Sequence, residues 1–460
     1  MKNQCQVLRQ FRQTVYQVLG PSRDAAFEMI DAIADSPHAR SAVEVSLSPL
    51  MQRRFSSVYK GLERSRPDSA ALRPLLVQAA ESQGSLLVEV AGTPCAVYAL
   101  DHTPYPRPSA PTVADRGYVH GAHGVHGAHG VQVGHQYSLL GRVLHAQGSW
   151  MGLVDGERIA TDTTPTALGA TQIQRLRRTA TLPFIVTADS EYVTEAILDT
   201  LADPPPGSEA GSAGSGVPLY LLMRFKGNRN LYEAPSARRP GQRGRTPQHG
   251  ARLQLNHPET LRAPEVSLRV EESNGGWVEI EVWSALHVKT RPQIPLCAVR
   301  VRSFQADGTL RYQRPLWLAW SGPAAMDWAT FWRVYLRRFC LEAVHQFTKN
   351  SLSWTRARLG YTEREERWSW LRVPFGQGLA YWQLVLALPL ARDARRAWEK
   401  PTKTGRPPTP GRVQRDYGSL FWRFGSPVRS PQPRGIPLGR ALGYRPEPRP
   451  RYEVVYKGAS

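Results

Sequence analysis

The spacing of apolar residues changes near residue 83, and this change limits the folds open to the chain. Residues 1–82 carry apolar side chains at helical spacing, with Gly, Pro and Ser between the segments. Beyond them the apolar runs become short and rich in β-branched and aromatic residues, as in SLLVEV and PCAVYALDHT. Such runs are typical of buried strands. Two further runs, YSLLGRVLHA and WMGLVDGERIA, are expected to form an antiparallel pair of strands.

The order of the elements that follow indicates a mixed α/β fold. We expect a helix around GATQIQRLRRTA, a strand at PFIVTADS, a helix at SEYVTEAILDTLA and a strand at YLLMRFKGN. Three strands, a helix, a strand, a helix and a strand fit a mixed sheet with helices packed on it. The segment 203–218, DPPPGSEAGSAGSGVP, has the composition of a flexible surface loop.

Composition divides the chain into five segments. Residues 1–82 form a helical N-terminal region, 83–231 form the first part of the α/β core, and 232–322 form a mostly β insertion that opens on the basic stretch PSARRPGQRGRTPQHGAR. Residues 323–400 hold a helix that returns to the core, followed by Trp-rich helices. Residues 401–460 form a basic, proline-rich tail that is expected to be extended rather than globular, and so suited to following a phosphate backbone.

The charge of the chain indicates a polyanionic partner. The 59 Lys and Arg residues exceed the 38 Asp and Glu residues and give a formal net charge of +21. Nucleic acid fits this excess better than an anionic membrane surface, since no run of about 18 apolar residues occurs. The N-terminus shows no secretory signal. Four scattered cysteines form no CxxC pair, which disfavours a zinc knuckle and favours a reduced, cytoplasmic setting: Cys5, Cys95, Cys297 and Cys340.

Two carboxylates stand where expected strands end. Asp101 follows the apolar run CAVYAL, and Asp189 follows FIVTA and precedes a helix. Ligand sites of open α/β sheets gather at the carboxyl ends of strands, so both are candidate site residues. Each also has a structural interpretation, because Asp189 suits the N-cap of a helix and Asp101 suits the start of a turn.

A third carboxylate lies in the cationic stretch WRVYLRRFCLEAVHQFTKN (332–350). If this stretch is one helix, a single stripe carries Tyr335, Arg338, Glu342 and Lys349. The neighbouring sector is apolar and holds Leu336, Phe339, Ala343 and Phe347. Glu342 is therefore expected at the edge of the buried face. The alternative is a surface ion pair between Glu342 and Arg338, worth a few tenths of a kcal/mol.

Asp101, Asp189 and Glu342 together predict an oxygen-only site suited to Mg²⁺ or Mn²⁺. Two such ions about 4 Å apart can activate a water or a 3′-hydroxyl and stabilise the leaving oxygen of a displacement at phosphorus. Phosphoryl transfer consists mainly of positioning and charge neutralisation, so these residues suffice without a nucleophilic side chain. A metal site that cuts phosphodiesters agrees with a charge that attracts nucleic acid.

The spacing of Tyr335, Arg338, Glu342 and Lys349 resembles the Y-R-E-K signature of a superfamily of bacterial insertion-sequence DDE transposases. VGHQYSLLGRV, RPLWLAW and PPTPGRVQRDY are similar to further segments of that family. The resemblance implies an RNase H-like catalytic core in which Asp101, Asp189 and Glu342 are the catalytic, metal-binding triad. It also implies that Tyr335, Arg338 and Lys349 bind DNA phosphates near the cut.

The function expected from this resemblance is cut-and-paste transposition. The protein would bind double-stranded DNA at element ends and at the target, use Mg²⁺ or Mn²⁺, and act as a homodimer in the DNA complex, with no membrane association and a nucleoid-associated, cytoplasmic location. The helical N-terminal region would recognise element ends or assist assembly. Two alternatives remain open: an RNase H-like nuclease or recombinase without strand transfer, and a domesticated, non-catalytic DNA-binding protein.

Three other features of the sequence are alternative candidates for functional residues. The repeat HGAHGVHGAHGVQVGH (120–135) offers five histidines to a transition metal, but we interpret it as an expanded loop. Three acids, Asp155, Glu157 and Asp162, are expected to be solvated in or beside a turn. A tryptophan of the insertion, Trp277 or Trp283, is a candidate for stacking on a base.

Overall fold

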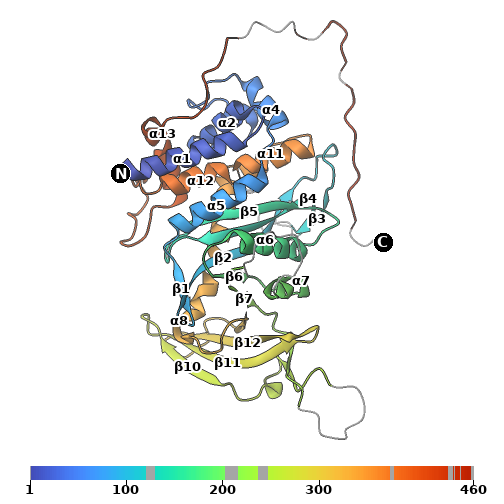
Figure 1. Cartoon of the computed structure of the whole chain (residues 1–460), viewed down its shortest axis with the longest axis vertical. Coiled ribbons are helices and arrows are strands. Elements are labelled where there is room, and N and C mark those ends of the chain that lie inside the picture. The colour runs from blue at the N-terminus through green and yellow to red at the C-terminus, as the bar shows by residue number, and fades with distance from the viewer. Residues whose placement is uncertain are drawn as a thin grey trace. The chain divides into compact units, whose positions relative to one another are not determined.

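The mixed α/β arrangement is confirmed: the chain combines helices with parallel and antiparallel strands (Figure 1). The computed structural model describes residues 2–120, 130–202, 216–236, 247–372, 378–433, 439, 441–445 and 447–456. Parts of three expected features lie outside these residues: the loop at 203–215, the histidine repeat at 121–129 and the basic stretch at 237–246.

The chain forms two compact units. The first, here called the helical unit, comprises residues 1–83, 102–165 and 340–460. The second, here called the sheet unit, comprises residues 84–101 and 166–339.

The helical unit is built mainly from helices of its two ends. These are α1 (Lys2–Val18), α2 (Arg23–Asp35), α3 (Ala42–Val45), α4 (Phe55–Arg64), α5 (Ser69–Gln83), α10 (Phe339–Asn350), α11 (Thr362–Arg372), α12 (Leu379–Ala387) and α13 (Pro410–Phe424). Helices α1, α2, α12 and α13 pack against one another (Figure 1). A buried ion pair between Arg12 and Asp31 at 2.6 Å lies among them. The expected helical character of residues 1–82 is confirmed.

The expectation of an extended tail is wrong for residues 410–424. They form helix α13, whose Val413, Tyr417 and Leu420 are buried. The Tyr417 hydroxyl donates a hydrogen bond to the side-chain oxygen of Gln383 on α12 at 2.6 Å. Apolar residues at helical spacing outweigh the basic, proline-rich composition of the segment, because they can bury one face against α12.

Three strands of the helical unit form an antiparallel group: β3 (Gly117–His120), β4 (Val131–Val143) and β5 (Met151–Ile159). The expected antiparallel pair β4–β5 is confirmed. The expectation that Asp155 is solvated is wrong. This residue lies within β5, is buried and pairs with Arg73 of α5 at 3.2 Å. Glu157 pairs with the same guanidinium. Both acids therefore hold α5 against the sheet.

The sheet unit holds a parallel group continued by antiparallel strands. Its strands are β1 (Leu87–Val90), the first part of β2 (Thr93–Pro106), β6 (Phe184–Ala188), β7 (Leu219–Arg224), β8 (Asn230–Glu233), β9 (Arg252–Gln254), β10 (Val266–Glu271), β11 (Trp277–Val288), β12 (Arg291–Phe304) and β13 (Leu316–Trp320). Its helices are α6 (Pro165–Thr179), α7 (Glu195–Leu198), α8 (Trp328–Phe331) and α9 (Arg333–Leu336). Strand β2 pairs in parallel with β6, and β6 with β7. Strands β7, β13, β12 and β11 follow in antiparallel order.

Neither tryptophan named from the sequence offers a free ring to a base. Trp283 is buried and donates its Nε1 hydrogen to the carbonyl of Arg262 at 2.7 Å. Trp277 lies on the middle strand β11, stacked on Phe304 of β12 at 5.1 Å and covered by Arg269 of β10 at 4.0 Å. Because these two partners come from the strands on either side of β11, they occupy both faces of the indole.

Candidate functional site

Three neighbouring parallel strands bring charged residues to one edge of the sheet unit. Ala99 of β2 pairs with Thr187 of β6, and Ala188 of β6 pairs with Met223 of β7. The same register carried to the strand ends sets Asp101, Asp189 and Arg224 in a row. Side chains at level positions of adjacent strands lie about 4.8 Å apart in backbone spacing and point to the same face.

Asp101 was expected at the end of its strand, but it lies within the strand. Strand β2 continues to Pro106, and alternate residues beyond Asp101, Thr103 and Tyr105, are buried. This alternation is the pattern of a strand with one covered face, so the chain continues without a turn. Only the parallel pairing with β6 ends near Asp101.

Asp189 follows β6 directly, as expected, but it is not a helix N-cap. Its Oδ1 accepts a hydrogen bond from the backbone N–H of Glu191 at 2.9 Å, which closes a short turn. The helix α7 begins later, after Thr194. The carboxylate of Asp189 is therefore held at the strand end by a turn of its own chain.

The stretch 332–350 is not one helix. Helix α9 ends at Leu336 and α10 begins at Phe339, and the backbone N–H groups of Arg337 and Arg338 bond three residues back rather than four. This tight turn rotates α10 relative to a continuous helix, so different side chains of the stretch become buried. The expected apolar sector is therefore wrong at Leu336 and Phe339, which are exposed.

Arg338 bonds to Asp101. Its Nη1 donates to Oδ2 of Asp101 at 3.0 Å, and the two side chains are only 8% and 15% exposed. Asp101 and Asp189 stand level on adjacent strands, where two carboxylates repel each other unless a cation balances them. The guanidinium of Arg338 is such a cation in this structure.

Tyr335 completes this group in the sheet unit. It is buried, and burial raises the pKa of its hydroxyl above the ordinary value. The positive charge of Arg338 and its hydrogen bond to the hydroxyl lower that pKa, and the charge of Arg224 lowers it further. The carboxylate of Asp189 raises it. The phenol therefore lies within electrostatic reach of all three charges, and α9, which carries it, packs on β6.

Glu342 and Lys349 lie on α10 in the helical unit. They are seven residues apart, so they share one face of the helix. The Nζ of Lys349 donates to Oγ1 of Thr103, two residues along β2 from Asp101. Glu342 therefore shares a helix face with the lysine that bonds to Thr103 of β2. Glu342 also stands in the first turn of α10 and Lys349 in the last, positions that the helix dipole favours for these charges.

The donor chemistry of Asp101 and Asp189 fits a hard divalent cation. Both offer carboxylate oxygens, the ligands that Mg²⁺ and Mn²⁺ prefer, and their level positions require a balancing positive charge. Within the described residues, no group of three His, Cys, Asp or Glu side chains is arranged to hold a metal ion. In this structure the guanidinium of Arg338 supplies a positive charge beside Asp101.

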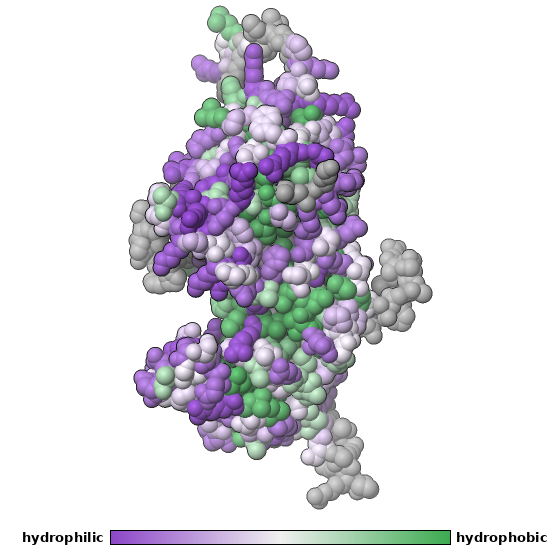
Figure 2. All heavy atoms as spheres, turned by 90° about the vertical axis from the view of Figure 1, so that its left-hand side faces the viewer, coloured by the Kyte–Doolittle hydropathy of each residue, from purple (hydrophilic) through white to green (hydrophobic). Residues whose placement is uncertain are grey.

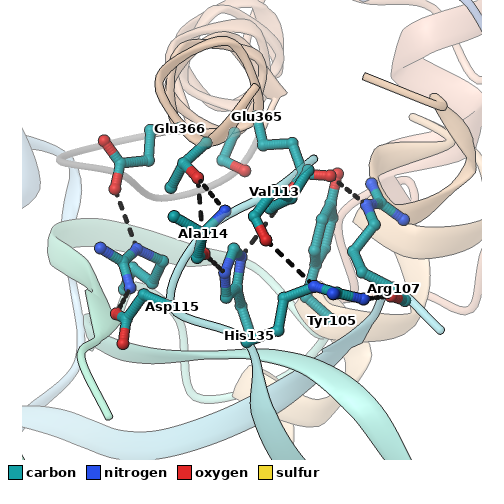
Figure 3. Close-up of polar contacts among 12 residues, drawn as sticks. Tyr105, Arg107, Val113, Ala114, Asp115, His135, Glu365 and Glu366 are labelled. Atoms are coloured by element: carbon teal, nitrogen blue, oxygen red, sulfur yellow. Dashed lines mark hydrogen bonds and ion pairs between the residues drawn. The ribbon is translucent and has the colours of Figure 1, made fainter. Parts of the chain in front are cut away.

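The last histidine of the repeat has a structural role. His135 lies on β4, is buried, and its Nε2 bonds to the carbonyl of Ala114 at 2.9 Å (Figure 3). Its Nδ1 lies 3.4 Å from the carboxylate of Glu365 on α11, which also receives the guanidinium of Arg107. His135 therefore helps to join α11 to the strands.

Sequence reasoning missed Arg224 and Thr103. The signal for Arg224 was available, because YLLMRFKGN was recognised as a strand and the strand-end argument applied to Asp101 and Asp189 applies to it equally. Thr103 carried no comparable signal. Its contact with Lys349 joins residues 246 positions apart, and no local pattern reveals such a pair.

The surface carries both hydrophilic and apolar side chains. Hydrophilic side chains cover much of the face shown in Figure 2, with apolar patches between them. Among the described residues, no helix is long and apolar enough to cross a membrane.

Comparison with known proteins adds one match. A family model described as DDE superfamily endonuclease matches residues 14–278, more than half of the 460 residues. The matched span includes Asp101 and Asp189 and ends before the stretch 332–350. No curated protein matches the chain in sequence.

Proposed function

Because the chain belongs to the DDE superfamily endonucleases, a family with an RNase H-like core, we propose that it is a DNA transposase. Membership of this family implies a nuclease-type activity on DNA. The proposal goes further: the protein cuts DNA at the ends of an insertion sequence and joins the freed 3′-hydroxyl to target DNA.

One observation carries the proposal. The parallel register of β2 and β6, extended two residues beyond its last pair, brings Asp101 and Asp189 level on neighbouring strands, and Arg338 pairs with Asp101. A pair of like charges held together is destabilising by itself, so its presence at a sheet edge favours a role in binding or catalysis. The Y-R-E-K spacing after the matched span supports the same interpretation.

Asp101, Asp189 and Glu342 are the residues that would hold Mg²⁺ or Mn²⁺. When bound, such ions activate the attacking water or 3′-hydroxyl and stabilise the leaving oxygen. The chain's own part is to place the three carboxylates. Strands β2 and β6 position the two aspartates through their backbone hydrogen bonds, and the Lys349–Thr103 contact ties α10, which carries Glu342, to β2.

Tyr335, Arg338 and Lys349 are proposed to bind the DNA backbone beside the cut. Arg338 offers a planar fork of N–H donors that suits a phosphate, and Lys349 offers a compact charge. The buried phenol of Tyr335 keeps its proton and can donate a hydrogen bond to a phosphate oxygen. In the free protein Arg338 is already held by Asp101, so little ordering is required of it when DNA arrives.

The test is cleavage of a labelled duplex that spans the DNA flanking the gene, in Mg²⁺. The wild type should cut it and join the product to a plasmid, and the Asp189→Asn variant should do neither. The matched control is Asp162→Asn, which removes one exposed carboxylate outside the site and should retain both activities. The mass of the DNA complex tests the proposed homodimer.

The outcomes separate the alternatives. Cutting without joining would indicate a nuclease that lacks strand transfer. If the wild type binds the duplex tightly but does not cleave it in Mg²⁺ or Mn²⁺, the protein is a non-catalytic DNA-binding protein. That result would contradict the proposal.

A further inference from the structure

A cleft in the sheet unit opens directly after Asp189. Its volume is about 470 Å³, and its walls include Ser190, Val193 and the loop that follows β7. This volume lies in the range of clefts that take small ligands. Three basic residues line it, Lys226, Arg229 and Lys289, and the described lining residues include no carboxylate.

Among the described residues, no carboxylate is paired with Arg229 of this cleft. Its Nη2 donates to the backbone carbonyl of Val193 at 3.1 Å, a neutral acceptor. Burial lowers the pKa of its guanidinium. A charge taken partly out of water and paired only with a carbonyl is costly for the protein, and an anion in the cleft would offset that cost. Lys226 and Lys289 stand exposed at the same cleft and add to its positive potential.

Asn230 is a second sign of a missing ligand. Asn230 lines the same cleft, and its side-chain oxygen is buried with no hydrogen-bond partner within the described part of the chain. Buried polar atoms are rarely left without a partner. The amide can present either its oxygen or its NH₂ group to a ligand by rotation about its last side-chain bond, so it suits a polar molecule in the cleft.

The position of the cleft identifies the ligand. It begins at Ser190, next to the candidate catalytic Asp189, and all its lining residues belong to the sheet unit. A polynucleotide that passes Asp189 carries one phosphate per nucleotide, and Lys and Arg side chains are the usual partners of such phosphates. We propose that Lys226, Arg229 and Lys289 bind a backbone phosphate of the DNA strand adjacent to the bond cut at Asp189. This inference rests on the proposed function for the identity of the strand.

The experiment is lysine footprinting of the wild-type protein. The protein is acetylated with an amine-reactive acetate ester in EDTA, with and without the flanking duplex or a short oligothymidylate, and the modified sites are measured by mass spectrometry. We expect bound DNA to slow acetylation of Lys226 and Lys289 by about fivefold, as expected for direct phosphate contacts. Lys60, an exposed lysine on α4, is the internal control and should react at nearly the same rate with and without DNA.

A pair of double variants tests the contribution to affinity. Lys226→Ala with Lys289→Ala should lower the slope of log affinity against log salt by about two. The matched control, Lys60→Ala with Arg314→Ala, removes two exposed cations elsewhere and should change the slope by less than one. Thermal melting checks that both double variants fold, which is expected because all four side chains are exposed.

Equal protection of Lys226, Lys289 and Lys60 would overturn the proposal. Protection by inorganic phosphate alone, with none by either DNA, would overturn the assignment to a DNA strand in favour of a small anion. Since the footprint is taken in EDTA, it does not depend on cleavage. Protection of the cleft in a protein that fails to cut would support the cleft and reject only the proposed transposase activity.

Discussion

Arg338 and Asp101 are joined by a hydrogen bond of 3.0 Å although 237 residues separate them in the chain. The bond ties the tight turn before α10 to strand β2, at the position level with Asp189. One arginine thus joins the turn after α9 to the strand that carries Asp101 and places a positive charge beside that carboxylate.

Replacing Arg338 should cost more stability than replacing a surface arginine. Loss of an exposed ion pair costs up to about 1 kcal/mol, whereas loss of one partner of a buried pair costs about 3–5 kcal/mol. We expect Arg338→Ala to lower the free energy of unfolding in urea by the larger amount. In an Asp101→Asn background the same change should cost much less, and an equal cost in both backgrounds would show that the bond to Asp101 is not responsible. Arg338→Lys should recover only part of the loss, because an ammonium lacks the planar fork.

Glu342→Gln should abolish cleavage of the flanking duplex in Mg²⁺ and leave DNA binding intact or tighter. The amide keeps the size of the side chain and removes a negative charge that metal binding requires. Binding is measured by fluorescence anisotropy and cleavage on a denaturing gel. The control is Glu89→Gln, an exposed glutamate on β1, which should cut normally. Retained cleavage in Glu342→Gln would remove this residue from the proposed triad.

Lys349 has two possible roles, and a second variant distinguishes them. If Lys349 acts on DNA, Lys349→Ala should impair cleavage strongly while Thr103→Val, which removes the hydroxyl that Lys349 contacts, leaves cleavage nearly unchanged. If Lys349 acts only by positioning α10, both variants should lose activity to a similar degree. We expect the first result. The measurement is single-turnover cleavage, with thermal melting of both variants as a check on folding.

Shortening the C-terminal segment should have two distinct effects. Deletion of residues 401–460 removes α13 and its buried side chains, so we expect loss of cooperative unfolding. Deletion of 431–460 keeps α13 and removes six Lys and Arg residues against two Glu. This shorter deletion should weaken DNA binding for all sequences and flatten its salt dependence. An unchanged salt slope would assign these residues to folding or assembly, since Tyr452 and Val455 also bond to the helical unit.

The paired histidines of the sheet unit should make stability depend on pH. His287 is buried and its Nε2 lies 2.9 Å from Nδ1 of His249; burial, and then the neighbouring His249, lower the pKa of His287 below its ordinary value of 6.5. The folded protein therefore binds fewer protons than the unfolded chain once the pH falls below about 6.5. The contribution to stability is complete above that pH and is lost as the pH falls through the lowered pKa.

His287→Phe should therefore reduce the drop in melting temperature between pH 8 and pH 5. The control is His257→Gln, an exposed histidine in the same unit that pairs with Glu259. It should keep the full drop. An equal drop in His287→Phe and in the wild type would place the acid sensitivity elsewhere.

Local sequence determined the kinds of element and one functional strand end. The five-residue run FIVTA is fully buried in β6, and Asp189 follows it at the strand end as predicted. Apolar residues at helical spacing in residues 1–82 became helices because each can cover one face against its neighbours. The Y-R-E-K spacing is likewise a property of the linear sequence and does not depend on any tertiary contact.

Tertiary structure decided where those elements stop and what their charges meet. Strand β2 runs past Asp101, because Thr103 and Tyr105 are buried by residues remote in the chain. The stretch 332–350 breaks at Arg337–Arg338, although its helical periodicity continues, and Arg338 bonds to Asp101 there. Periodicity reports which side chains a local element can bury. It carries no information on the partner a charge will find hundreds of residues away, since that partner is set by how the strands align across the whole sheet.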